Sequence, residues 1–301
     1  MKPEIGDLYS RSAGLIENDA LLRKRVTIIG LGSFGSQIAV ELAKAAVGSF
    51  TLIDFDKLEA HNIVRHACFL KDVGRLKVDA VKDLILGKNP YAMVEKLAID
   101  ISSEDSSVMN AIANSDIAIC ATDNNASRFK IAALTTQYGK TCIYGRANTR
   151  AEGGDVFIQR PNGPCYGCLL GVASFDPNAE EVTSKDAGLR SGKIAGYTSE
   201  DDANAIIQVG LSSDITPITN MMVKLALMEL SKGTAGGLVK LEEEYVYDYW
   251  MWANRRDRRF ARWSPFPQAG ATPTILRWYG AHIAKDEWCA LCGSGEVALD
   301  D

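Results

Sequence analysis

Short apolar runs alternate with stretches of helical periodicity along the first half of the chain. The runs predict strands at 26–30, 50–54, 94–99, 117–121 and 141–145. The stretches between them predict helices at 34–46, 74–87, 105–114 and 124–138. This alternation predicts an α/β fold, namely a doubly wound, Rossmann-like and mostly parallel sheet with helices on both faces. A further apolar run at 154–160 extends the fold to a Pro-Asn-Gly-Pro turn.

The pattern changes after residue 170. Residues 171–216 are rich in Gly, Ser, Asp and Lys, with a weak helix signal near 202–208, and we interpret them as a mobile crossover segment. A strong helix is predicted at 217–231, with Pro217 in its first turn. We therefore divide the chain into a Rossmann-like region at 1–170, the crossover at 171–216, and a part at 217–301 that closes the same domain.

Composition and charge narrow the function classes. The 301 residues are 47% hydrophobic and carry a net charge of −5, so bulk electrostatics gives no reason to expect a nucleic-acid partner. An aromatic and basic stretch at 245–263 ends in RRDRRFARW, which we interpret as a contact for an acidic carrier or a partner enzyme. The N-terminus shows no signal-peptide pattern, and no apolar run approaches the roughly 18 residues that span a membrane. We expect a cytoplasmic protein without membrane contact.

A glycine-rich loop follows the first predicted strand. Gly30, Gly32 and Gly35 have the spacing G-x-G-x-x-G, which lets a phosphate approach the N-terminus of the next helix. A tight strand-to-helix turn without a ligand would also explain the glycines. Asp54 ends the second strand, where a carboxylate can accept hydrogen bonds from ribose hydroxyls. NAD and ATP fit these features equally well, so an NAD(P)- or FAD-binding oxidoreductase and an adenylating enzyme both remain open.

Three polar residues after the second strand favour a triphosphate. Asn62, Arg65 and Lys77 are placed in loops and at the start of a helix. Two cations beside a phosphate cradle suit ATP better than a dinucleotide, because the leaving pyrophosphate must be stabilised. Arg65 or Lys77 taken alone is better explained as an ordinary surface charge.

The cysteines predict a metal site. Cys165 and Cys168 form one C-x-x-C pair, and Cys289 and Cys292 form a second. Four thiolates in two such pairs are the ligands of a tetrahedral structural Zn²⁺, although buried cysteines without a metal are an alternative. The metal would tie the chain end to the core. Two further cysteines lie within predicted strands, which favours core positions, and the role of Cys68 stays open.

Several motifs in order identify a family resemblance. They are GLGSFG, the run D-F-D-x(5)-N-x-x-R followed by V-G-x-x-K, IAICATDNNASR at 117–128, and the two C-x-x-C pairs. Together with YSRSAGL at 9–15, these motifs resemble the ThiF/MoeB and ubiquitin-activating (E1-like) adenylyltransferase superfamily. The resemblance implies that 1–170 is an ATP-binding adenylation region and that the two C-x-x-C pairs hold Zn²⁺.

The resemblance also implies roles for single residues. The three glycines would lie under the ATP phosphates, Asp54 would hold the ribose, and the polar trio after the second strand would contact the triphosphate. Asp123 would bind Mg²⁺ near the α- and β-phosphates, although an Asp in this position is often a helix N-cap. Arg11 would reach the ATP of the second subunit of a homodimer. Its motif departs from the family because Ser12 stands where Gln is common.

The implied reaction activates a small protein. Attack of its C-terminal carboxylate on the α-phosphate of Mg·ATP gives an acyl-adenylate and pyrophosphate, and the enzyme supplies positioning and cations rather than a base. The length of 171–288 favours a ubiquitin-like protein in a conjugation pathway, with a conjugating (E2-like) enzyme as a further partner. A sulfur-carrier protein of thiamine- or molybdopterin-type cofactor synthesis is the alternative. A further alternative is a degenerate homologue that binds a carrier protein without ATP chemistry.

The fate of the acyl group is less well determined. Many members of the family carry a further cysteine after the first C-x-x-C pair, but this chain has none between Cys168 and Cys289. Ser212, five residues before Pro217, is the closest match to that position and could accept the acyl group as an oxyester. The alternative is that Ser212 and its neighbours are loop and cap residues ahead of the helix.

Overall fold

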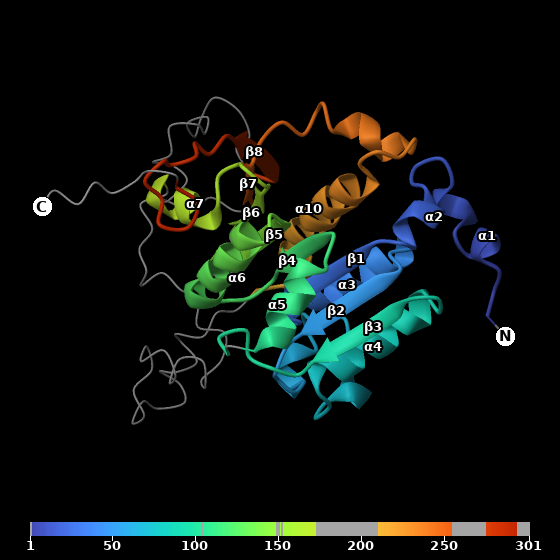
Figure 1. Cartoon of the computed structure of the whole chain (residues 1–301). Helices are drawn as coiled ribbons and strands as arrows, with labels where there is room; N and C mark the ends of the chain where they lie inside the picture. Colours follow the sequence, from blue (N-terminus) through green and yellow to red (C-terminus); the bar gives the residue numbers. More distant parts are fainter. Residues whose placement is uncertain are drawn as a thin grey trace, which may run out of the picture.

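The computed structural model describes residues 2–103, 105–148, 151, 153–172, 210–254 and 275–293. Within these residues the fold is built on one eight-stranded sheet with the order β3-β2-β1-β4-β5-β6-β7-β8 (Figure 1). The strands are β1 (Arg25–Ile29), β2 (Ser49–Ile53), β3 (Met93–Leu97), β4 (Ile117–Cys120), β5 (Thr141–Ala147), β6 (Gly153–Gln159), β7 (Tyr249–Ala253) and β8 (Arg277–Ala281). The six strands predicted from the apolar runs are confirmed, with ends that differ by no more than two residues.

The sheet is parallel from β3 to β5 and antiparallel beyond β5. Central strand β1 pairs with β2 on one side and with β4 on the other, with Val26 opposite Phe50 and Ile117. The strand order therefore reverses between β1 and β4. Loops leaving the carboxyl ends of these two strands diverge, and the crevice between them is where ligands bind in this class of sheet.

Helices cover both faces of the sheet (Figure 1). The helices are α1 (Ile5–Leu8), α2 (Asn18–Leu21), α3 (Ser33–Lys44), α4 (Lys77–Lys88), α5 (Ser106–Ala113), α6 (Asn125–Gln137), α7 (Tyr166–Val172) and α10 (Ser212–Ser231), with 3₁₀ turns η1 (Ser10–Ser12), η2 (Ala60–Asn62), η3 (Leu70–Asp72) and η6 (Gly237–Leu241). Alternate residues of the central strands enter one of two cores. The α3, α4 and α10 side includes Ile28 and Met222, and the α5 and α6 side includes Ile29 and Ile131. The doubly wound Rossmann-like prediction is confirmed.

Helix α10 begins at Ser212, five residues before the predicted start, so Pro217 lies inside the helix rather than in its first turn. Pro217 is the sixth residue of the helix and has no N–H to donate to the carbonyl group four residues before it, so α10 lacks one backbone hydrogen bond in its second turn. The hydroxyl of Thr216 donates a hydrogen bond to the carbonyl oxygen of Ser212 at 2.8 Å, a contact between successive turns at this end of the helix. The prediction that Ser212 precedes the helix was therefore wrong.

Strands β7 and β8 were not predicted. All five residues of β7 are buried, with Trp250 in one core and Met251 in the other, so its YWMWA sequence shows no polar alternation. The predicted aromatic and basic stretch thus contains a strand, and RRDRRFARW lies outside the described residues. The predicted mobile crossover is described only at its ends, since residues 173–209 also lie outside them.

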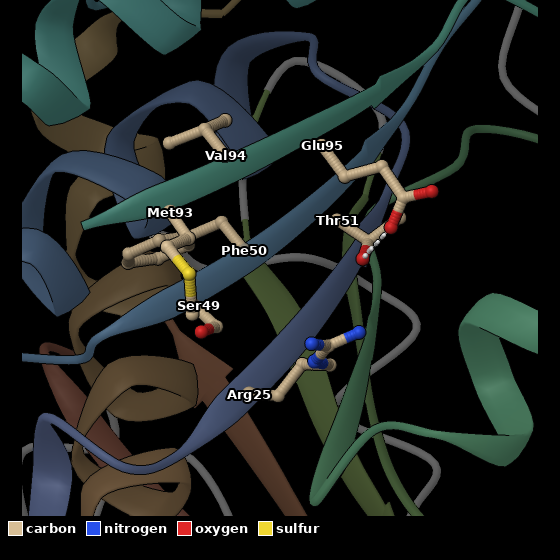
Figure 2. Close-up of a pocket in the computed structure, with 7 residues that line it drawn as sticks. All are labelled: Arg25, Ser49, Phe50, Thr51, Met93, Val94 and Glu95. Atoms are coloured by element: carbon tan, nitrogen blue, oxygen red, sulfur yellow. Dashed lines mark hydrogen bonds between the residues drawn. The ribbon is translucent and has the colours of Figure 1, made fainter.

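One open pocket of about 260 Å³ lies on the first three strands, far from the β1–β4 crevice. Figure 2 shows its lining residues, Arg25, Ser49, Phe50, Thr51, Met93, Val94 and Glu95. Arg25 and Ser49 begin their strands, so this pocket lies at the amino edge of the sheet, whereas the glycine-rich loop leaves the carboxyl edge. Among the described residues, no helix is long and apolar enough to cross a membrane.

Candidate nucleotide site and four-cysteine cluster

The glycine-rich loop connects β1 to α3 at the crevice. Gly30 has a φ of +85°, and a Cβ atom there would lie 2.7 Å from the carbonyl oxygen of Ala121 after β4. A Cβ atom on Gly35 would lie 1.9 Å from the carbonyl oxygen of Gly30. Both positions therefore require glycine, and Gly32 precedes α3 as its N-cap. The arrangement presents the N-terminus of a twelve-residue helix to the crevice, which suits a phosphate.

Asp54 lies directly after β2 and supports this loop. Its Oδ2 accepts a hydrogen bond from the backbone N–H of Leu31 at 2.6 Å, and its Oδ1 accepts one from Asp56 at 2.8 Å. Burial raises the pKa of Asp54, which the positive charge of Lys77 opposes. The carboxylate is 9% exposed and lies where the sequence predicts a ribose contact.

Lys77 is a buried cation at the start of α4. Its Nζ donates a hydrogen bond to Oδ2 of Asp56 at 2.7 Å, and the residue is 8% exposed. Burial alone would lower the pKa of Lys77, but the charge of Asp54, the hydrogen bond to Asp56 and the charge of Asp123 outweigh it and raise that pKa. The amine therefore stays protonated, stabilised by two carboxylates of the loop after β2 and one of the loop after β4.

The segment after β2 positions Asn62 and Arg65. Oδ1 of Asn62 accepts the backbone N–H of Glu59 at 2.9 Å, which orients its amide nitrogen away from that contact. The carbonyl oxygen of Arg65 accepts hydrogen bonds from Ser33 Oγ at 3.0 Å and Gln37 Nε2 at 3.1 Å, both on α3. These bonds hold the backbone of Arg65 against the helix that follows the glycine-rich loop.

His66 supports the loop from the same segment. Its Nε2 lies 2.7 Å from the carbonyl oxygen of Leu31, and its Nδ1 accepts the backbone N–H of Cys68 at 3.1 Å. Burial lowers the pKa of His66 to about 4, so the ring is neutral and Nε2 carries the proton. No local sequence pattern identifies this bond between His66 and the glycine-rich loop.

Asp123 follows β4 on the other side of the crevice. The alternative role as a helix cap is taken by Asn124, whose Oδ1 accepts the backbone N–H of Ser127 at 2.8 Å at the start of α6. Asp123 is exposed, and its charge acts on Lys77. The structure therefore places Asp123 within electrostatic range of Lys77 and assigns the cap to Asn124.

Arg11 and Ser212 lie differently with respect to this site. Arg11 is exposed in η1, next to Tyr9, whose hydroxyl contacts the carbonyl oxygen of Ala43. Ala43 is about 16 Å along α3 from the glycine-rich loop, so η1 packs near the far end of this helix. Ser212 begins α10, and Thr216 in the next turn contacts the same Gln37 side chain that holds Arg65. Ser212 is thus on the side of the molecule that carries the crevice.

The two C-x-x-C pairs form one cluster between α7 and the chain segment at 289–292. The four sulfur atoms all lie within 4.8 Å of one another, and three of the separations are 3.9, 3.5 and 3.3 Å. A tetrahedral Zn²⁺ with Zn–S bonds of about 2.3 Å would separate its sulfurs by about 3.8 Å. The cluster therefore has the ligand set and spacing of a structural zinc site, as predicted. Cys120 and Cys142 are buried in β4 and β5, as expected, and Cys68 is buried too.

A sequence model of the ThiF family matches residues 9–261. A molybdopterin-synthase adenylyltransferase of Salmonella typhimurium is 32% identical over 57% of this chain, and a SAMP-activating enzyme E1 of Haloferax volcanii is 31% identical over 54%. The chain spans 67% and 62% of those two proteins, and 28% of an uncharacterised protein, y4oA, of Sinorhizobium fredii. A crystal structure of E. coli MccB with ATP has the same fold, with a TM-score of 0.64 and 16% identity over 95% of this chain and 74% of that one.

Proposed function

Because this chain belongs to the ThiF family, we propose that it uses Mg·ATP to adenylate the C-terminal carboxylate of a small ubiquitin-like or sulfur-carrier protein. The observation that carries the proposal is Lys77, a buried and protonated amine beside the glycine-rich loop, held by Asp56 at 2.7 Å. An oxidoreductase has no need of a buried cation at this point. A triphosphate that loses pyrophosphate does need one.

The proposed reaction exchanges one bond to phosphorus for another. A carboxylate oxygen of the carrier bonds to the α-phosphorus, the bond to the bridging oxygen breaks, and the electron pair leaves with pyrophosphate. Lys77 and Arg65 stabilise the charge on the phosphates, and Asn62 donates a hydrogen bond from its amide nitrogen. Asp54 orients the ribose. No general base is needed because the attacking carboxylate is already ionised, and both ring nitrogens of the nearby His66 are occupied by backbone hydrogen bonds.

Two metal ions belong to the proposal. Asp123 would be the protein ligand for Mg²⁺, which supplies charge neutralisation on the α- and β-phosphates when bound. Zn²⁺ would be held by Cys165, Cys168, Cys289 and Cys292, and it has no open position for chemistry with four protein thiolates. Its role is to hold the segment at 289–292 against α7.

A homodimer is also proposed. Arg11 lies in η1 beside Tyr9, which contacts the far end of α3 from the glycine-rich loop, so we propose that its family role is exercised on the loop of a second subunit. Beside Arg65, the chain exposes large apolar side chains: Val64 is 75% exposed, Phe69 57% and Leu70 71%. Such a patch next to the site is typical of a surface that a protein partner covers. We assign it to the second subunit that delivers Arg11.

The pathway is the finer part of the proposal. We favour a ubiquitin-like protein for conjugation and a conjugating enzyme as a further partner, with sulfur-carrier activation as the alternative, since relatives with names of both kinds match the chain.

Ser212 as an acyl acceptor would give an oxyester. Mass spectrometry after incubation with ATP and carrier tests this: a hydroxylamine-sensitive adduct that Ser212→Ala abolishes supports transfer, and no adduct in either protein excludes it.

Pyrophosphate exchange tests the main proposal. The chain is incubated with ATP, Mg²⁺, labelled pyrophosphate and a small carrier protein that ends in Gly-Gly, and label in ATP is measured. Exchange that depends on the carrier and disappears when its last glycine is deleted supports adenylation. A nicotinamide or flavin oxidoreductase and a degenerate binding module would both give no exchange with any carrier. Comparing a ubiquitin-like with a sulfur-carrier protein then separates the two pathways.

A further inference from the structure

A buried chain of polar side chains runs from the four-cysteine cluster toward the Asp123 loop. Asn125, the first residue of α6, is 8% exposed, and its Oδ1 accepts a hydrogen bond from the hydroxyl of Tyr166 at 3.0 Å. The same oxygen accepts Nη1 of Arg128 at 3.3 Å. Nη2 of Arg128 then donates to the carbonyl oxygen of Thr122 at 2.6 Å, and Thr122 directly precedes Asp123.

Tyr166 is rigidly placed at the other end of this chain. It lies between Cys165 and Cys168, and its side chain is fully buried. Its ring stacks on Tyr144 with centroids 4.9 Å apart and meets Phe129 edge-on at 5.9 Å. Packing of the ring therefore fixes the position of the hydroxyl group, which contacts Asn125.

The chemistry of the donor and acceptor groups determines which atoms meet along this series of hydrogen bonds. A hydroxyl and a guanidinium both point at one oxygen of Asn125, so that oxygen is the carbonyl oxygen of the amide. Arg128 is 7% exposed, and its Nε has no hydrogen-bond partner among the described residues. Its two Nη contacts are then what compensate the burial of its charge. Loss of the contact with Asn125 would leave Nη1 unpaired as well as Nε, and would free Arg128 to move away from the carbonyl of Thr122.

We propose that Tyr166 is a positioning residue through which the four-cysteine cluster fixes the loop that carries Asp123. The inference rests on the proposed function, in which Asp123 holds Mg²⁺ on ATP. Tyr166, which lies between two cysteines of the cluster, thus has a role beyond packing. The cluster thereby acts on nucleotide binding although none of its sulfurs contacts the nucleotide.

A comparison of two tyrosine variants tests the proposal. Tyr166→Phe keeps the ring and removes the hydroxyl. The matched control Tyr144→Phe removes a buried hydroxyl from the same stack, where it contacts Gln159 at 3.3 Å and not Asn125. The Kd of ATP is measured with Mg²⁺ and with Mg²⁺ omitted, and zinc content is measured on the same samples. We expect Tyr166→Phe to raise the Kd of Mg·ATP by about five- to tenfold, with unchanged zinc content and little change in the Kd without Mg²⁺.

The other outcomes are distinct. If Tyr166→Phe binds Mg·ATP as tightly as the unaltered chain, or weakens binding equally with and without Mg²⁺, the positioning role is wrong. If Tyr144→Phe gives the same Mg²⁺-dependent loss, the effect belongs to the core and not to Tyr166. If the unaltered chain does not bind Mg·ATP, the proposed function fails instead. Asn125→Ala provides a second test at the middle of the chain, and it should reproduce the Mg²⁺-dependent loss.

Discussion

Asp54 and Leu31 are joined by a 2.6 Å hydrogen bond between a carboxylate oxygen and a backbone N–H. This bond ties the end of β2 to the middle of the glycine-rich loop, so the residue predicted to hold the ribose also shapes the phosphate cradle. Each carboxylate oxygen has a further lone pair, and both can therefore accept ribose hydroxyls while keeping their backbone partners. The charge on Asp54 is in turn stabilised by Lys77, which makes the cradle dependent on that lysine.

Lys77→Met should nearly abolish pyrophosphate exchange. The variant removes the buried cation, so the pKa of Asp54 should rise further and the phosphates lose a charged donor. We expect the exchange rate to fall by roughly 100-fold or more. Lys88→Met, at the exposed far end of the same helix, is the matched control and should leave the rate within about twofold. An unchanged rate in Lys77→Met would place the chemistry elsewhere.

Asp123→Asn should change the requirement for Mg²⁺ and leave the fold intact. The amide keeps the size of the side chain but removes the charge that binds the metal, so the Mg²⁺ concentration for half-maximal exchange should rise by roughly tenfold or more. The thermal midpoint should stay unchanged because Asn124 caps α6. Asn124→Ala should lower stability by about 1 kcal/mol. A lower midpoint in Asp123→Asn without a change in Mg²⁺ dependence would mean that Asp123 has a structural role.

Gln37 should act on ATP through Arg65. Its Nε2 donates to the carbonyl of Arg65, and its Oε1 lies 3.2 Å from the hydroxyl of Thr219 on α10. Gln37→Leu should raise the Kd of ATP by about fivefold, because the backbone of Arg65 loses one of its two anchors. Gln37→Glu should be no better, since a carboxylate cannot donate to a carbonyl. Isothermal titration with ATP measures both, and tight binding by Gln37→Glu would contradict this network.

His66 should make the folded state less stable in acid. The unfolded chain protonates His66 below about pH 6.5, whereas the folded chain does so only below about pH 4, because burial lowers that pKa. The unfolded state therefore binds more protons in this window, and stability falls as pH decreases from 6.5 to 4, by up to about 3 kcal/mol. Thermal midpoints across this window measure the loss. His66→Gln should reduce the slope, whereas the exposed His61→Gln should keep it; equal slopes for all three proteins would refute the assignment.

Arg11 should act between subunits. Arg11→Ala and Lys77→Met should each be inactive alone, but a mixed dimer contains one site with both residues intact. Random mixing at equal amounts should restore about a quarter of the exchange activity. Arg23→Ala, a nearby exposed position, should retain activity by itself. If native mass spectrometry detects mixed dimers and no activity returns, Arg11 does not complete the partner's site.

The sequence by itself determined where the first six strands lie along the chain and where the glycine-rich loop lies. Parallel strands buried on both faces are continuous apolar runs, and the glycines are required by close backbone contacts, so both are readable locally. The four cysteines were equally readable because their pairwise spacing reflects metal geometry. In contrast, β7 was not recognised, because its aromatic run stands next to the basic stretch RRDRRFARW and the two were interpreted together as a contact surface.

Only the tertiary structure decided which polar side chains serve the site and which serve the fold. Asp123 and Asn124 are adjacent in sequence, and the capping contact alone shows that Asn124 starts the helix. The bonds of His66 and Gln37 join segments about 30 residues apart, and the bond from Tyr166 to Asn125 joins segments 41 apart. Such contacts depend on how the strands order in the sheet, and no local pattern encodes them.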